Sequence, residues 1–395
     1  MENYSKYLCI FGGGAVRGYT YLGVLKAFEE FNFRPQQLAG SSVGAVIAGF
    51  YAIGMDYFDI SKVICDVNFE LFKDINLKFT PAFAISKGEV FLNWLRENIE
   101  KFYYKEDYKK GQNSPVCFKD LDRDFFVITT DLTNSCPFIF SKQTTPNFEV
   151  AQAIRASASM PGLLSPVEYE GKLLTDGDLM KSNPMWKLNP LLNPEDLRIL
   201  ELRLEGVSND NNIKNLFDYF NKIYSCITNY STDFIIDMYS NKDKFDYIKI
   251  DTKDLILVNF NIKQEIREKL FDIGYETTTK FFKEDLPNKR ANILGHYSSL
   301  LEKIELIENC IDSNDLRKTK KAIGDIFEVL SDIKKTIDYK ILKKIKKFRN
   351  LFNDNLTCGI FGKEKLTNKK EIKASLNALK MILLEKCNEL EEKFI

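Results

Sequence analysis

The sequence predicts an α/β fold followed by a helical C-terminal region, on three observations. The apolar run 7–11 ends in glycines and is followed by an apolar helical stripe. A second apolar helix begins directly after Ser42. This alternation of strand and helix is typical of an α/β sheet. Near Pro287 the composition changes: proline disappears and lysine, glutamate, leucine and isoleucine dominate, which indicates the helical region.

The N-terminal elements follow from the spacing of apolar residues. Residues 7–11 form a short continuous apolar run, which suits a strand buried on both faces. Apolar residues then recur at helical spacing over 21–31 and over 43–54. From 55 to 124 the pattern is helical and loop-like, with one amphipathic helix over 91–99.

The later elements follow from the same rules. Short apolar or alternating runs predict strands at 125–130, 137–140, 173–175, 199–204 and 247–250. Helical spacing predicts helices at 212–242 and 262–283. Apolar residues at helical spacing over 326–341 and over 372–383 indicate helices in the C-terminal region as well. We therefore expect two domains, residues 1–288 and a region of two to four helices over residues 289–395.

Composition excludes several classes of protein. The 395 residues are 44% hydrophobic and 13% aromatic, which is ample for a buried core. Lysine plus arginine and aspartate plus glutamate number 56 each, so no overall charge favours nucleic acid. Eight scattered cysteines without a C-x-x-C pair indicate reduced, mostly buried thiols rather than disulfides or a zinc site. Without a signal-peptide pattern or a long uncharged apolar stretch, we expect a soluble cytoplasmic protein.

The strongest motif is Gly40-Ser41-Ser42-Val43-Gly44, a G-x-S-x-G sequence at the start of an apolar helix. In such an elbow, a serine on a tight turn between strand and helix exposes its hydroxyl, and the glycines allow neighbouring backbone to approach. The spacing selects Ser42 as the nucleophile. Ser41 occupies the unconstrained position, where we expect a small polar filler. The helix N-terminus favours negative charge developing at Ser42.

A glycine-rich loop, Gly-Gly-Gly-Ala-Val-Arg-Gly over residues 12–18, supplies backbone N–H donors where a strand ends and a helix begins. This arrangement suits an oxyanion hole. One alternative is a dinucleotide-binding loop, but Arg17 replaces its last glycine and no second strand ends in an acid at the expected distance. The other alternative is a tight turn between strand and helix with a purely structural role. The candidate oxyanion loop consists of Gly12, Gly13, Gly14, Ala15, Val16 and Arg17.

The general base of a reactive serine is usually a histidine, yet the chain has one histidine, His296, far from these motifs. The simplest base is then a carboxylate. Asp176 directly follows an apolar strand, so its side chain should emerge at a strand end. Burial can raise the pKa of such a carboxyl group and improve it as a base. An isolated Asp-Gly is more often a turn, but the glycine loop and Ser42 favour a catalytic role.

At these residues the chain resembles the patatin-like phospholipase family. The resemblance covers residues 7 to about 185 and implies a three-layer α/β/α hydrolase fold, with residues 1–288 as the catalytic domain. It implies a Ser42–Asp176 dyad, an oxyanion loop at 12–17, and hydrolysis of lipid acyl esters with no metal or organic cofactor. The matching segments are 12–18, 22–25, 40–44, 130–133, 153–161, 166–167, 176–177 and 183–184.

The chain departs from the family at Asp178, which follows Asp176 and Gly177 where glycine or alanine is usual. A second carboxylate there either couples to Asp176 or faces solvent. The other departure is the helical region 289–395, which the resemblance does not cover.

The helical region contains a basic amphipathic helix over Lys334–Arg349, with eight basic residues against one acid. Such a helix can lie on an anionic membrane surface as a peripheral contact. The alternative is that its apolar side packs on neighbouring helices and its lysines stay in solvent. A bundle that shields the active site or forms a homo-oligomer fits the same residues.

Together these features predict a serine acyl hydrolase of the phospholipase A or lysophospholipase type, acting on a phospholipid or another lipid ester. One alternative is a catalytically weak lipid-binding or interaction module with the same fold. The intact Ser42, Asp176 and glycine loop argue against it, since a binder needs none of them. A nucleotide-dependent enzyme is a further alternative, which Arg17 disfavours.

Overall fold

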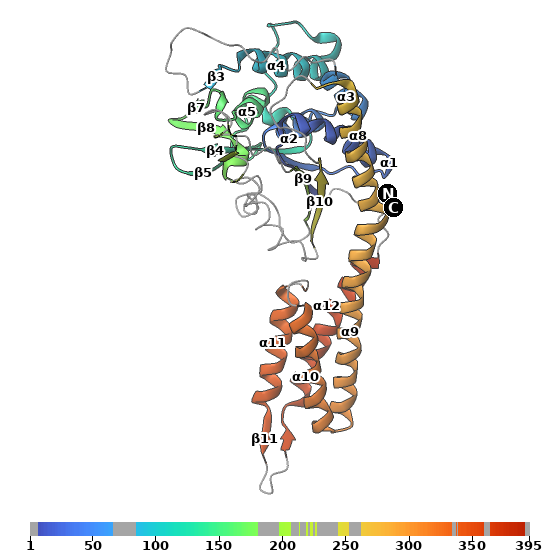
Figure 1. Ribbon diagram of the computed structural model, residues 1–395. Coiled ribbons are helices and arrows are strands. Elements are labelled where there is room, and N and C mark those ends of the chain that lie inside the picture. The colour runs from blue at the N-terminus through green and yellow to red at the C-terminus, as the bar shows by residue number, and fades with distance from the viewer. Residues whose placement is uncertain are drawn as a thin grey trace. The chain divides into compact units, whose positions relative to one another are not determined.

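The computed structural model describes residues 7–65, 84–180, 197–206, 244–252, 262–333, 339–358 and 364–391, with residues 213, 219, 222, 223, 226 and 337. The chain divides into two compact units (Figure 1). The N-terminal unit comprises Met1–Ser240 and Lys244–Phe281, and the C-terminal unit comprises Asn241–Asp243 and Phe282–Ile395. The domain boundary expected between residues 288 and 289 stays a prediction.

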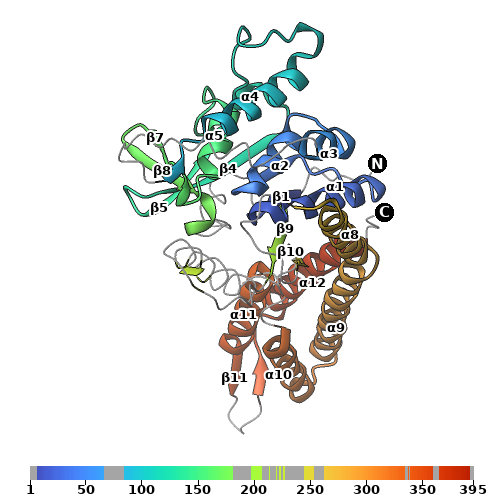
Figure 2. The same cartoon turned by 45° about the horizontal axis from the view of Figure 1, so that its top comes forward.

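An eight-stranded mixed sheet forms the centre of the N-terminal unit (Figures 1 and 2). Its order is β10 (Phe245–Asp251), β9 (Arg198–Glu205), β1 (Tyr7–Phe11), β2 (Gln37–Gly40), β4 (Asp124–Asp131), β8 (Lys172–Asp176) and β7 (Val167–Tyr169). Strand β5 (Cys136–Phe140) also pairs with β4. Pairs among the first five strands are parallel, and the pairs β4–β5, β4–β8 and β7–β8 are antiparallel.

The predicted α/β class is confirmed, and each predicted strand is present. Strand β2 was missed, because Gln-Leu-Ala-Gly is too short and too weakly apolar to register as a strand. Its Leu38 and Ala39 are nevertheless fully buried between β1 and β4. The predicted helix at 212–242 and the motif at 183–184 lie outside the described residues.

Helices α1, α2 and α5 of the N-terminal unit pack on the same face of the sheet. Gly49 of α2 faces Ile154 of α5 and Phe125 of β4, and Phe11 stacks edge-to-face on Tyr21 of α1 at 5.2 Å. The described helices are α1 (Thr20–Glu30), α2 (Val43–Ala52), α3 (Tyr57–Cys65), α4 (Glu89–Tyr104), α5 (Val150–Ser157) and α8 (Gln264–Lys280). Short elements are η2 (Ala15–Tyr19), η4 (Lys105–Asp107), η5 (Phe118–Asp120), η6 (Gly177–Met180), and the paired β3 (Ala84–Ser86) and β6 (Gly162–Leu164).

Helices α1 and α8 cross in backbone contact, and both ribbon views show them side by side (Figures 1 and 2). A Cβ on Gly23 would lie 2.0 Å from the carbonyl oxygen of Phe271, and one on Gly274 would lie 2.0 Å from that of Thr20. Only glycine permits this approach at either position. The crossing fixes α8 against the helix that follows the glycine loop.

The C-terminal unit is a bundle of four described helices joined to a small hairpin. The helices are α9 (Leu286–Asp312), α10 (Leu316–Ile333), α11 (Tyr339–Asp354) and α12 (Lys369–Glu391), and a π-helical turn, Phe281–Asp285, precedes α9. Their apolar stripes form one buried cluster. The expected helical region is thus confirmed. The hairpin of β11 (Leu356–Cys358) and β12 (Glu364–Leu366) was not predicted.

The basic helix predicted over Lys334–Arg349 corresponds to α11, which begins only at Tyr339, and its apolar stripe packs inside this bundle. Ile337, Ile341, Ile345 and Phe348 are all at most 8% exposed. The packing alternative is therefore confirmed for the apolar side. The exposed basic side chains of α11 include Lys343, Lys344, Lys346, Lys347 and Arg349.

Two composition-based expectations can be compared with the structure. No helix among the described residues has the length and apolar character needed to cross a membrane. The described cysteines are free, but the expectation that most are buried is wrong. Cys9, Cys310 and Cys387 are buried, Cys117 and Cys136 are half-buried, and Cys65 and Cys226 are exposed.

Candidate active site

Ser42 lies on a strained turn between β2, which ends at Gly40, and α2, which begins at Val43. It caps α2 with φ 51° and ψ −130°. A positive φ is rare for a residue with a side chain and costs about 1–3 kcal/mol. This is the backbone geometry of a nucleophile elbow.

The elbow glycines are required by close backbone contacts. A Cβ on Gly40 would lie 2.6 Å from Cα of Ala45, and one on Gly44 would lie 2.2 Å from the carbonyl oxygen of Phe11. Strand β1, the elbow and the first turn of α2 therefore pack without intervening side chains.

Ser157, the last residue of α5, ties the elbow to β4. The backbone N–H of Ser42 donates to Ser157 Oγ at 3.0 Å, and that hydroxyl donates to the carbonyl oxygen of Ile128 at 2.6 Å. Ser157 belongs to the segment that resembled the family, but the sequence assigned it no role. Its bonds help to hold the strained turn.

Asp176 is fully buried at the end of β8, in register with Thr129 of β4. Its Oδ1 accepts the backbone N–H of Asp178 at 2.9 Å. A Cβ on Gly177 would lie 2.3 Å from the carbonyl oxygen of Ile128 and 3.0 Å from Cβ of Ser41. The Asp-Gly-Asp turn is therefore packed directly against the elbow.

Asp178 is wedged between the glycine loop and both serines. Ser41, fully buried, donates its hydroxyl to Asp178 Oδ1 at 2.5 Å. A Cβ on Gly13 would lie 1.7 Å from Asp178 Oδ2 and 2.8 Å from Cβ of Ser42. Because Asp178 is only 7% exposed, the solvent-facing alternative is wrong. Ser41 is also more than a filler, since it binds this carboxylate.

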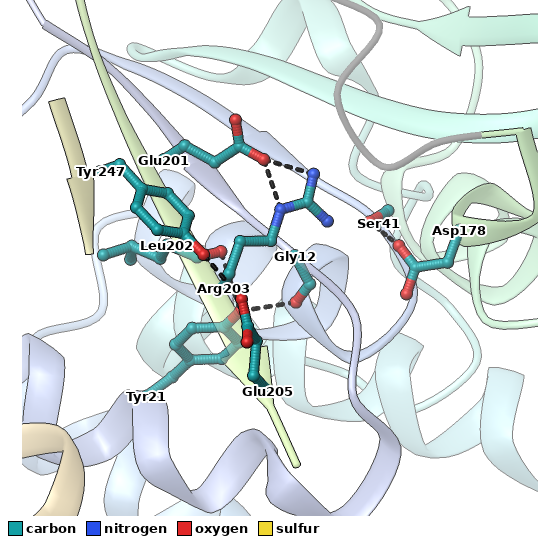
Figure 3. Close-up of polar contacts among 9 residues, drawn as sticks. All are labelled: Gly12, Tyr21, Ser41, Asp178, Glu201, Leu202, Arg203, Glu205 and Tyr247. Atoms are coloured by element: carbon teal, nitrogen blue, oxygen red, sulfur yellow. Dashed lines mark hydrogen bonds and ion pairs between the residues drawn. The ribbon is translucent and has the colours of Figure 1, made fainter. Parts of the chain in front are cut away.

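The glycine loop is held at its start by backbone and phenol contacts. Gly12 donates its N–H to the carbonyl oxygen of Leu202 at 3.1 Å, and Tyr21 donates its hydroxyl to the carbonyl oxygen of Gly12 at 2.6 Å (Figure 3). Burial raises the pKa of Tyr21 well above its ordinary value, so the phenol stays a donor. Buried Arg17 folds back and donates Nε–H to the carbonyl oxygen of Gly14 at 3.3 Å.

A buried ion pair lies beside this loop and was missed by the sequence interpretation. Arg203 and Glu201 of β9 are 5% and 2% exposed, and the Arg203 guanidinium donates to the Glu201 carboxylate (Figure 3). Arg203 Nη1 lies 3.1 Å from where a Cβ of Gly12 would be. Burial acts to lower the pKa of Arg203, but the charges of Glu201 and Asp178 raise it above its ordinary value. The sequence did contain a sign of this pair: Glu201 and Arg203 are opposite charges two residues apart, so they lie on the same face of a strand that is otherwise apolar and buried.

The structure thus brings Ser42, Gly13 and the Asp176-Gly177-Asp178 turn together. A strained serine at a helix N-terminus, a glycine loop rich in N–H groups and two buried carboxylates suit acyl transfer. His296 lies on α9, in the C-terminal unit.

Comparison with known proteins extends this result. Residues 9–188 match the sequence model of the patatin-like phospholipases. The uncharacterized protein R571 of Acanthamoeba polyphaga mimivirus is 27% identical over 293 residues, which cover 70% of this chain and 93% of that protein. Lysophospholipase NTE1 of Kluyveromyces lactis is 26% identical over 183 residues, 45% of this chain and 11% of that protein.

One solved structure gives the fold independently. The crystal structure of VipD from Legionella pneumophila matches with a TM-score of 0.50 and 16% sequence identity, covering 98% of this chain and 88% of that chain. With the family match, it confirms the predicted patatin-like α/β/α fold with a helical C-terminal region.

Proposed function

Since residues 9–188 belong to the patatin-like phospholipase family, we propose that this chain is a lipid acyl hydrolase of the phospholipase A or lysophospholipase type. Ser42 Oγ attacks the ester carbonyl and Asp176 accepts its proton. Backbone N–H groups of the 12–17 loop, aided by the N-terminus of α2, hold the negative oxygen of the tetrahedral intermediate. Protonated Asp176 then gives the proton to the leaving alcohol, and the regenerated carboxylate takes a proton from the water that releases the fatty acid from Ser42.

The observation that carries this proposal is the backbone conformation of Ser42, with φ 51°. If this turn had only a structural role, a glycine at position 42 would adopt the same positive φ without strain, so the presence of a serine needs another reason. Strain of this kind persists where surrounding contacts impose it, and it is concentrated at active sites. Here Gly44 and Ser157 impose it from two sides.

Asp176 is preferred to Asp178 as the base for a geometric reason. Asp178 already accepts the hydroxyl of Ser41 at 2.5 Å and is directed toward that neighbour. Asp176 is fully buried, and burial makes a carboxylate a stronger base. The like charge two residues away acts in the same direction.

The proposed substrate lies in a membrane or at a lipid surface, so a peripheral contact is part of the proposal. The basic side chains on the outer face of α11, Lys343, Lys344, Lys346, Lys347 and Arg349, would attract anionic lipid. Because the apolar stripe of α11 is buried in the bundle, this contact is electrostatic rather than inserted.

A serine-directed fluorophosphonate probe tests the proposal. We expect the full-length chain to be labelled at Ser42, and a mixed bilayer extract to release fatty acid only when Ser42 is intact. A folded chain that binds vesicles but is neither labelled nor releases fatty acid would instead be a lipid-binding module.

A further inference from the structure

Two buried opposite charges lie on either side of the first two loop glycines. Arg203 Nη1 is 3.1 Å from where a Cβ of Gly12 would be, and Asp178 Oδ2 is 1.7 Å from where a Cβ of Gly13 would be. Because both loop residues are glycines, neither contributes a side chain to separate these groups. Figure 3 shows the Arg203 guanidinium directed toward the side where Asp178 meets Ser41.

Burial makes each of these charges dependent on the other. Asp178 is 7% exposed and Arg203 is 5% exposed. A buried carboxylate is costly unless an opposite charge and hydrogen bonds compensate it. Ser41 gives Asp178 a neutral hydrogen bond, and the charge of Asp178 in turn helps to raise the pKa of Arg203. Glu201 holds the guanidinium on its other side.

We propose that Arg203 is a positioning residue of this active site, acting from β9 through Asp178 on the elbow. Its positive charge compensates the buried Asp178 carboxylate, so that Asp178 can anchor Ser41 and hold the turn that presents Ser42. The Glu201 carboxylate fixes the direction of the guanidinium. Arg203 itself touches no reacting atom. The inference rests on the proposed function, because it assigns Ser42 as the reacting group.

The decisive experiment is a charge-removal cycle, read by the rate of fluorophosphonate labelling of Ser42 against pH. Arg203→Met keeps the length of the side chain and removes its charge. We expect labelling to slow by about tenfold or more, the size of coupling found between residues of one charge network. The acidic limb of the pH profile should move to higher pH, because the nearby carboxylates lose a cation.

Two further variants separate charge from packing. Arg203→Lys restores the charge and should recover most of the lost rate and the original pH profile. Asp178→Asn keeps an acceptor for Ser41 and removes the negative charge that Arg203 balances. Added to Arg203→Met, it should recover rate and return the acidic limb toward lower pH.

Arg198→Met is the matched control. Arg198 is on the same strand and is also paired with a buried acid, Asp246, at 3.6 Å, but it lies at the start of β9. Its loss should reduce stability without moving the pH profile. Equal pH profiles for Arg203→Met and the wild type would overturn the proposal.

Thermal unfolding of the same variants distinguishes this inference from the proposed function. If the wild type does not react at Ser42, the proposed function fails, but the charge relationship can still be measured. The double variant Arg203→Met with Asp178→Asn should then unfold at a higher temperature than Arg203→Met alone, because it leaves only Glu201 as a buried charge without a counter-charge, whereas Arg203→Met leaves both Glu201 and Asp178. Additive losses would show that Arg203 and Asp178 are not coupled.

Discussion

Asp176 accepts the backbone N–H of Asp178 through Oδ1 at 2.9 Å, which closes a short side-chain turn over Gly177. The turn directs the two carboxylates to different neighbours. Asp178 reaches Ser41 and the glycine loop, while Asp176 remains at the end of β8. The unusual second acid of the Asp-Gly-Asp sequence therefore has a defined place in the site.

The first prediction separates the two adjacent serines. Ser42→Ala should abolish labelling and ester hydrolysis while the fold is kept, because only one hydroxyl is lost. Ser41→Ala removes the hydrogen bond to Asp178 and should slow the reaction without abolishing it. Probe labelling and circular dichroism of both purified variants check this. Turnover by Ser42→Ala together with an inactive Ser41→Ala would show that the assigned nucleophile is wrong.

The second prediction concerns the base. Asp176→Asn can still accept the N–H of Asp178, so the turn should survive, but the amide cannot take the proton of Ser42. We expect a loss of about 10²–10⁴ in rate, as is typical when a positioned base is removed. His296→Ala should be close to wild type in a steady-state ester assay. A severe kinetic defect in folded His296→Ala would restore a histidine to the mechanism.

The third prediction tests the glycine loop. Gly13→Ala would place a methyl group 1.7 Å from Asp178 Oδ2 and 2.8 Å from Cβ of Ser42. Relief of this clash must move the loop, so we expect labelling to fall by about 10²–10³, the loss seen for an oxyanion donor. Gly295→Ala in α9 is the control, since its methyl group meets nothing within 4 Å. Full reactivity of Gly13→Ala would place the loop away from the reacting centre.

Local patterns predicted the parts of this molecule that depend on local physics. Strands such as 7–11 and helices such as 43–54 follow from apolar spacing, and the placement of Ser42 between strand and helix follows from the elbow glycines. The helical C-terminal region followed from composition in the same way.

The remaining features depend on contacts between distant segments. The hydrogen bond of Ser41 to Asp178 joins residues 137 positions apart, and the Arg203 guanidinium reaches the loop only because β9 pairs with β1. Strand register of this kind is set by the whole sheet. The antiparallel direction of β8, which places Asp176 beside Thr129 near the end of β4, could not be predicted from local patterns either.

The fourth prediction follows from a buried phenol at the start of α1. Burial raises the pKa of Tyr19 to about 12, with Arg267 opposing the shift and Cys65 adding to it. A raised pKa favours the folded state below pH 10, and this contribution is lost as pH rises, because the unfolded phenol ionises first. Relative to Tyr19→Phe, the wild type should lose about 1 kcal/mol of unfolding free energy between pH 9 and pH 11. Urea unfolding at both pH values measures this, and a constant difference would contradict it.

The last prediction concerns the basic face of α11. Replacing Lys343, Lys344, Lys346 and Lys347 with glutamine should leave the bundle folded, because the apolar stripe of the helix is what packs in the core. Loss of four charges should weaken binding to anionic vesicles by about tenfold or more at low salt, and by less at high salt. Hydrolysis of a soluble short-chain ester should not change, since no active-site residue is altered.

The matched control replaces four exposed lysines of the N-terminal unit, Lys105, Lys109, Lys110 and Lys119, and should bind vesicles like the wild type. Equal vesicle binding by both quadruple variants would remove α11 from the membrane contact and leave its basic face as a solvated surface of the bundle.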